Sequence, residues 1–93
     1  MRNRELSSVA KLALASLYGN TNRTKDAVSL YEELSNKPTA SVSKVAAQLQ
    51  LAELYQSTKQ TADAKRVYET IKKDNPTGEA AQRATQKLAE LAK

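Results

Sequence analysis

The chain has 93 residues, a formal net charge of +5, no cysteine and no histidine. This length allows one domain at most, or a stackable piece of one, and the missing residue types exclude disulfides, thiol chemistry and the commonest general base and metal ligand. Good helix formers dominate, with only two glycines and two prolines and with four tyrosines as the whole aromatic content, which predicts an all-α fold.

The basic excess is spread along the chain. Residues 1–41 carry a net charge of +2 and residues 42–93 a net charge of +3, and acidic residues are interleaved almost everywhere. We interpret this pattern as a solvated helix surface in preference to a phosphate-binding track, so a nucleic-acid partner is not the first expectation. The charged start, Met1 to Glu5, and the interruption of the following apolar run by Lys11 predict neither a signal peptide nor membrane insertion. The composition fits a soluble protein of either the cytoplasm or the periplasm.

In chain order, the first expected helix reaches Tyr18 and is apolar on nearly all sides. A polar turn, Gly19 to Arg23, separates it from a second helix. Thr24 is the expected N-cap of that helix, and Asp26 is a favourable charge near its positive end. The segment NKPT, residues 36–39, ends the second helix because proline disfavours helical geometry in the residue before it.

The following elements repeat this plan. Residues 42–57 form the third expected helix, and Thr61 is the expected N-cap of the fourth, with Asp63 in its first turn. The segment DNPT, residues 74–77, ends the fourth helix. A last helix over residues 77–92 has a narrow alanine and leucine stripe, which is typical of a solvated capping helix at a natural end.

The chain matches itself after a shift of 37 residues. The shift superimposes Leu14 on Leu51, Tyr18 on Tyr55, Ala27 on Ala64, Tyr31 on Tyr68 and Leu34 on Ile71. A period of this length indicates stacked helical repeats. A lone helical hairpin cannot bury its own apolar face, so we expect stacking to complete the core and all four tyrosines to pack in it.

In this register the sequence resembles the tetratricopeptide repeat family, whose fold is an α-solenoid of antiparallel helices. The residues that occupy its signature positions are Tyr18, Ala27, Tyr31, Tyr55, Ala64, Tyr68 and Pro76. The resemblance implies five helices in a single domain of residues 1–93: a first repeat at about 8–41, a second at about 45–78 and a capping half-repeat at about 79–92.

The sequence also departs from the family pattern. Lys11 and Gln48 stand where the family favours tryptophan, and the spacing is 37 residues in place of 34. We expect the extra residues, Val42 to Lys44 and Glu79 to Ala81, to lengthen the start of the next first helix. Long, divergent repeats of this kind are similar to those of bacterial envelope and assembly-factor members of the family.

The first helix has the composition of an interior helix although it is the first in the chain. This composition predicts that a further element, not among the expected helices, covers the apolar surface of the first helix. Two arrangements would supply it: a longer repeat array of which this chain is the carboxyl-terminal piece, or a homo-oligomer formed through the first helix.

The resemblance implies a protein–protein interaction scaffold that binds a peptide or a helix in the concave groove formed by successive first helices. Carried over position by position, the groove would present Leu12, Ser16, Leu49, Gln50, Glu53, Gln56, Arg83 and Lys87. Some members clamp a partner's terminal carboxylate. Arg83 and Lys87 match the third-repeat part of that clamp and Gln50 replaces its asparagine, whereas Leu12 and Ser16 do not match it.

No catalytic, metal-binding or phosphate-binding motif occurs, so neither an enzyme nor a cofactor is predicted. Two alternatives to the peptide-binding scaffold stay open. One is a basic helical array that binds nucleic acid, and the other is a purely structural or self-associating repeat unit, including an engineered one.

Overall fold

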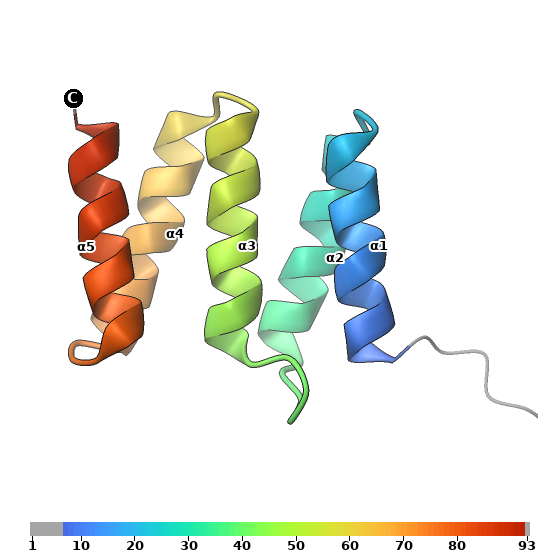
Figure 1. The fold of residues 1–93 in the computed structure, drawn as a ribbon, viewed down its shortest axis with the longest axis horizontal. Coiled ribbons are helices and arrows are strands. Elements are labelled where there is room, and N and C mark those ends of the chain that lie inside the picture. Colours follow the sequence, from blue (N-terminus) through green and yellow to red (C-terminus); the bar gives the residue numbers. More distant parts are fainter. Residues whose placement is uncertain (1–6, 93) are drawn as a thin grey trace, which may run out of the picture. The chain divides into compact units, whose positions relative to one another are not determined.

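The structure is a computed structural model that describes residues 7–92. Over these residues it consists of five α-helices: α1 (Ser8–Asn20), α2 (Thr24–Asn36), α3 (Lys44–Ser57), α4 (Thr61–Asp74) and α5 (Glu79–Leu91) (Figure 1). The chain divides into two compact units, with the boundary inside α3 between Ala47 and Gln48. The all-α prediction is confirmed.

The first unit is built on the packing of α1 against α2. Ala15 and Ala27 are completely buried, one on each helix, and their small side chains allow the two backbones to approach closely. At the far end of α2, Leu34 packs with Val42 and Ala47, and Leu12 of α1 covers this cluster from the side. A continuous apolar contact therefore joins α1, α2 and the first turn of α3.

The loop from α2 to α3 is organised by the start of α3. The Ser43 hydroxyl accepts a hydrogen bond from the Ala46 backbone N–H at 3.1 Å, as an N-cap side chain does. Val42 precedes this cap and packs with Ala47 in the fourth helical position, which is the arrangement of a hydrophobic staple. Val42 and Ser43 therefore cap α3 and do not lengthen it, which corrects the prediction for these two residues. Glu79 to Ala81, by contrast, do lie in α5 as expected.

The second unit contains the rest of α3 together with α4 and α5. Tyr68 and Ile71 of α4 are completely buried, as is Ala64 at the start of the same helix. Helix α5 packs directly on α4. Ala84 of α5 is also completely buried, so a small residue again sits at a helix contact.

The expected N-caps are wrong by one residue. Helices α2 and α4 begin at Thr24 and Thr61 themselves, and neither preceding residue makes a side-chain cap hydrogen bond. The acidic first turns are confirmed. Asp26 forms an ion pair with Arg23 at 2.8 Å, and Asp63 forms one with Arg66 at the same distance. Local ion pairs and the helix dipole thus replace threonine capping at these helix starts.

The turns before α2 and α4 share a left-handed residue at the same repeat position. Asn22 has φ 65° and Lys59 has φ 63°. Asparagine tolerates this conformation better than lysine does, because its short polar side chain can bond locally. The shift of 37 residues therefore preserves the turn geometry but not the residue best suited to it.

Both prolines follow helix ends as predicted. Helix α2 ends two residues before Pro38 and α4 ends two residues before Pro76. Three of the four tyrosines are buried, with exposures of 4% for Tyr31, 7% for Tyr55 and 0% for Tyr68. Tyr18 differs. It is half-buried, and the Arg23 guanidinium lies over its ring at 4.3 Å from the centroid. The charged start of the chain, Met1 to Glu5, lies outside the described residues.

Candidate peptide-binding face

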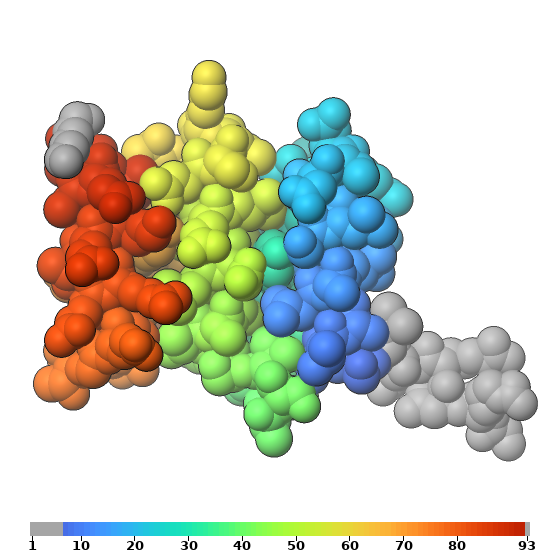
Figure 2. Space-filling view, in the orientation of Figure 1, coloured from blue at the N-terminus to red at the C-terminus, as the bar shows by residue number. Residues whose placement is uncertain are grey.

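In the second unit, α3 and α5 stand on the same side of α4 (Figure 1). The space-filling view shows their side chains covering this face, with α4 visible only behind them (Figure 2). We call the face formed by α3 from Gln48 onward and by α5 the first-helix face. Six of the predicted groove residues lie on these two helices and outside the unit's buried core: Leu49, Gln50, Glu53, Gln56, Arg83 and Lys87.

A polar network connects the first-helix face to α4. The Tyr68 hydroxyl donates a hydrogen bond to Gln56 Oε1 at 3.1 Å, which ties α4 to the end of α3. Burial raises the pKa of Tyr68 to about 12, and the carboxylates of Glu53 and Glu90 add to this shift because they disfavour a nearby phenolate. Glu53 of α3 and Glu90 of α5 therefore both lie close enough to Tyr68 to disfavour its ionisation.

The other predicted residues of this face differ in their exposure to solvent and in their ion pairing. Gln50 and Arg83 are exposed, and Leu49 is half-buried. Lys87 lies 4.0 Å from Glu90 across one helical turn, so its ammonium already has an acidic neighbour. Arg83 is the other cation of the predicted carboxylate clamp on α5, and it forms no ion pair with the described residues.

The two predicted groove residues of α1 lie in the first unit. Ser16 is exposed on α1. Leu12 is half-buried because it packs against the Leu34, Val42 and Ala47 cluster. Much of the Leu12 side chain is thus used in the core of the first unit, which leaves less of it for a ligand than its repeat position predicted.

The two positions where the family favours tryptophan behave differently in the two units. The Lys11 ammonium donates a hydrogen bond to Glu33 Oε2, and this bond holds the pKa of Glu33 below its ordinary value. Gln48 is 7% exposed, and its Oε1 is buried without a hydrogen-bond partner. The residue equivalent to Glu33 in the second repeat is Thr70, which cannot form an ion pair.

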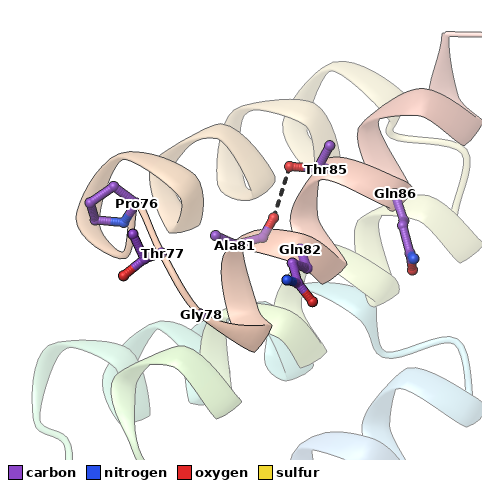
Figure 3. Close-up of a pocket in the computed structure, with 7 residues that line it drawn as sticks. All are labelled: Pro76, Thr77, Gly78, Ala81, Gln82, Thr85 and Gln86. Atoms are coloured by element: carbon purple, nitrogen blue, oxygen red, sulfur yellow. Dashed lines mark hydrogen bonds between the residues drawn. The ribbon is translucent and has the colours of Figure 1, made fainter.

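An open depression lies at the start of α5. Figure 3 shows its lining, which comes from the α4–α5 connection and the first two turns of α5: Pro76, Thr77, Gly78, Ala81, Gln82, Thr85 and Gln86. The Thr85 hydroxyl donates to the Ala81 carbonyl at 2.9 Å, so it is satisfied within its own helix. None of these lining side chains is ionisable, and the depression therefore offers no acid–base pair.

The comparison with protein families decides the identity of the fold. A tetratricopeptide repeat model matches residues 22–88, which is most of the chain and includes both helices of the polar network. The chain belongs to the tetratricopeptide repeat family. The suspected family is thereby confirmed, together with its α-solenoid type of helical repeat. Comparisons with curated proteins and with solved structures gave no significant match.

Tetratricopeptide repeats generally mediate protein–protein interactions, and members of the family typically act as non-enzymatic scaffolds. Within residues 7–92 no helix has the length and hydrophobicity needed to cross a bilayer. The same residues contain no group of three acidic side chains placed to hold a metal ion. Sequence reasoning placed Tyr68 in the core correctly. Its hydroxyl bond to Gln56 had no separate signal, because the twelve-residue separation reflects how the helices pack and not a local motif.

Proposed function

We propose that this tetratricopeptide repeat chain is a protein-binding scaffold without catalytic activity, and that the first-helix face binds an extended peptide or a helix of a partner protein. One observation carries the proposal. Helices α3 and α5 stand on the same side of α4, and the Tyr68 hydroxyl of α4 donates a hydrogen bond to Gln56 at the end of α3. Helix α4 holds α3 through the Tyr68–Gln56 bond and packs directly against α5, so the two helices offer a preformed surface, which lowers the ordering cost of binding.

The chemistry of the face favours a partner that hydrogen-bonds and carries charge. Gln50 offers an amide to a peptide backbone, and Glu53 offers a carboxylate to a basic or hydroxyl side chain. Arg83 is the best-placed group for a partner carboxylate, since Lys87 already lies beside Glu90. We expect binding to depend on few of these residues, with Arg83 and Glu53 contributing most.

Selection of peptides on the full chain tests this proposal. A library of random peptides is selected on the immobilised protein, and the affinity of the best binder is measured by fluorescence polarisation. The triple variant Gln50→Ala/Glu53→Ala/Arg83→Ala should weaken binding at least about tenfold, because it removes the polar contacts of the face. The matched control is Lys65→Ala/Glu69→Ala/Lys72→Ala, whose residues are exposed on α4, and it should change affinity less than about twofold.

Two results would contradict the proposal. One is a selected peptide whose affinity falls equally in both triple variants. The other is tight binding of random-sequence RNA by the wild type that weakens steeply as salt is raised, in the absence of any peptide binder, since that behaviour marks a phosphate-binding surface.

A further inference from the structure

Helix α1 carries an apolar stripe that the described residues leave partly uncovered. Ala10, Leu14 and Leu17 are spaced four and three residues apart, so they lie on one side of the helix, and we call them the outer stripe. Leu17 is 55% exposed, and Ala10 and Leu14 are half-buried. Val9 beside the stripe is 56% exposed. Val9 and Leu17 are the large hydrophobic side chains found exposed in residues 7–92.

The same stripe recurs on the later first helices and is buried there to a greater extent. Shifting by one and by two repeats gives Ala47, Leu51 and Leu54 on α3, and Ala84, Leu88 and Leu91 on α5. Ala47 and Ala84 are completely buried, and Leu54 is 8% exposed in contrast to 55% for Leu17. The difference is not one of residue type, because alanine and leucine occupy these positions in all three helices.

Contacts inside each unit show which element lies against the alanine of the stripe. In the first unit, Ala47 of α3 packs with Leu34 at the end of α2. In the second unit, α5 packs on α4, with Ala84 completely buried. In both cases the stripe alanine of a first helix is buried on the side of the second helix that precedes it in the chain. The outer stripe of α1 continues this interface but has no preceding second helix within residues 7–92.

The charges around the outer stripe are compatible with an apolar helix packed against it. No ionisable side chain belongs to the stripe, and Lys11, the charged residue of the described α1, is paired with Glu33. An apolar helix could therefore cover the stripe without burying an uncompensated charge. A second copy of this chain is a poorer match, because its α2 and α4 already contact Ala47 and α5 respectively.

We propose that the outer stripe is a docking surface for the second helix of a further tetratricopeptide hairpin, packed ahead of α1 as α4 packs ahead of α5. The helix it fits has the apolar side of α4, with a large aliphatic residue equivalent to Ile71, which is completely buried and occupies the repeat position from which Leu34 packs with Ala47. This surface is separate from the first-helix face, so each can be tested without the other.

The test adds a second helix of this kind to the full chain, ahead of α1. A copy of residues 61–78 is inserted between Arg4 and Glu5, which reproduces the register in which Gly78 precedes Glu79. Because the chain has no cysteine, a single Leu17→Cys substitution reports accessibility by its rate of reaction with a thiol reagent. The insertion should slow this reaction at least about tenfold, since the thiol becomes buried. Ser29→Cys, at an exposed position of α2, should react at the same rate with and without the insertion.

A polar version of the insertion is the matched control. Aspartate at the inserted position equivalent to Ile71 should restore fast labelling of Leu17→Cys. Without any cysteine, the apolar insertion should give a higher Tm than the polar one, so the comparison does not depend on the cysteine variant folding normally. The proposal is overturned if the two insertions label alike and melt alike. It is also overturned if the chain without an insertion forms a dimer in sedimentation that protects Leu17→Cys, because a second copy would then be the occupant.

Discussion

The hairpin of α1 and α2 and the hairpin of α3 and α4 place equivalent residues at their helix crossings and at the ends of their second helices. Ala27 and Ala64 are both completely buried, and Leu34 and Ile71 are 3% and 0% exposed. These positions tolerate little variation, because a close helix crossing needs a small side chain and an apolar cluster needs volume. The repeat is therefore conserved within the chain where atoms are packed.

The polar contacts of the two hairpins are different. The first hairpin has the Lys11–Glu33 ion pair, whereas Gln48 at the equivalent position of the second is left with a buried, unpartnered Oε1. The second hairpin has the Tyr68–Gln56 hydrogen bond, and the residue equivalent to Gln56 in the first is Gly19. One backbone plan can therefore carry different polar contacts, because each contact depends on a few side chains that can change independently.

The largest change in stability is expected when the buried aliphatic residue at the end of each second helix is shortened. Ile71→Ala and Leu34→Ala should each lower the free energy of unfolding by roughly 2–5 kcal/mol, because each leaves a cavity in a tightly packed site. Urea unfolding followed by far-UV circular dichroism measures both. A loss below about 1 kcal/mol in one variant only would show that the two sites are not energetically equivalent.

The second test concerns Gln48, the buried polar residue of α3. Gln48→Leu should raise the free energy of unfolding by about 1–3 kcal/mol, because it removes a buried oxygen that has no hydrogen-bond partner. Lys11→Leu is the matched control and should produce no gain, since it breaks the ion pair with Glu33. Equal gains from both substitutions would mean that the orphaned oxygen is not the cause.

The third test breaks the polar link found in the second hairpin. Tyr68→Phe should lower the free energy of unfolding by about 0.5–1.5 kcal/mol at neutral pH, because the hydroxyl bond to Gln56 is lost. Thermal unfolding of the two proteins at pH 7 gives this difference.

The same substitution should also change the response to alkaline pH. The unfolded chain releases the Tyr68 phenolic proton near its ordinary pKa of 10.0, whereas the folded chain retains it up to about 12. Between these pH values the unfolded state binds fewer protons, so the free energy of unfolding falls as the pH rises. Tyr68→Phe should show a shallower fall over this range, and identical slopes would contradict the assignment.

The smallest test exchanges the left-handed residues of the two turns. Lys59→Asn should raise the free energy of unfolding by a few tenths of a kcal/mol, and Asn22→Lys should lower it by a similar amount, because asparagine is the better residue at positive φ. Chemical denaturation at fixed temperature measures both changes. The result turns against this explanation if the two substitutions shift stability in the same direction.

Much of the fold could be predicted from the sequence. The 37-residue shift and the helix-ending segments NKPT and DNPT located all five helices, because helical periodicity and proline restrictions are local properties. The N-caps were missed by one residue, since Arg23 and Gln60 do not have the side chains that mark a cap in sequence. The role of Val42 was also missed. A hydrophobic staple is recognisable only once the helix start at Lys44 is known.

The candidate site was predictable to a smaller extent. The resemblance to tetratricopeptide repeats predicted which residues form the groove, and the two helices that carry most of them, α3 and α5, lie on one side of α4. It did not predict that Leu12 is partly used in the core of the first unit, or that Lys87 lies beside Glu90. Both depend on which neighbours a side chain meets across helices, which a repeat register does not specify.

By itself, the sequence determined that the chain is helical, where its helices begin and end to within a few residues, and which apolar residues recur. These properties follow from short-range preferences and from a period that can be counted. Only the tertiary structure decided which recurring residues are covered. Leu17 and Leu54 are the same residue at the same repeat position, yet one is 55% exposed and the other 8%. Burial depends on what packs against a residue, and identical local sequences cannot encode different neighbours.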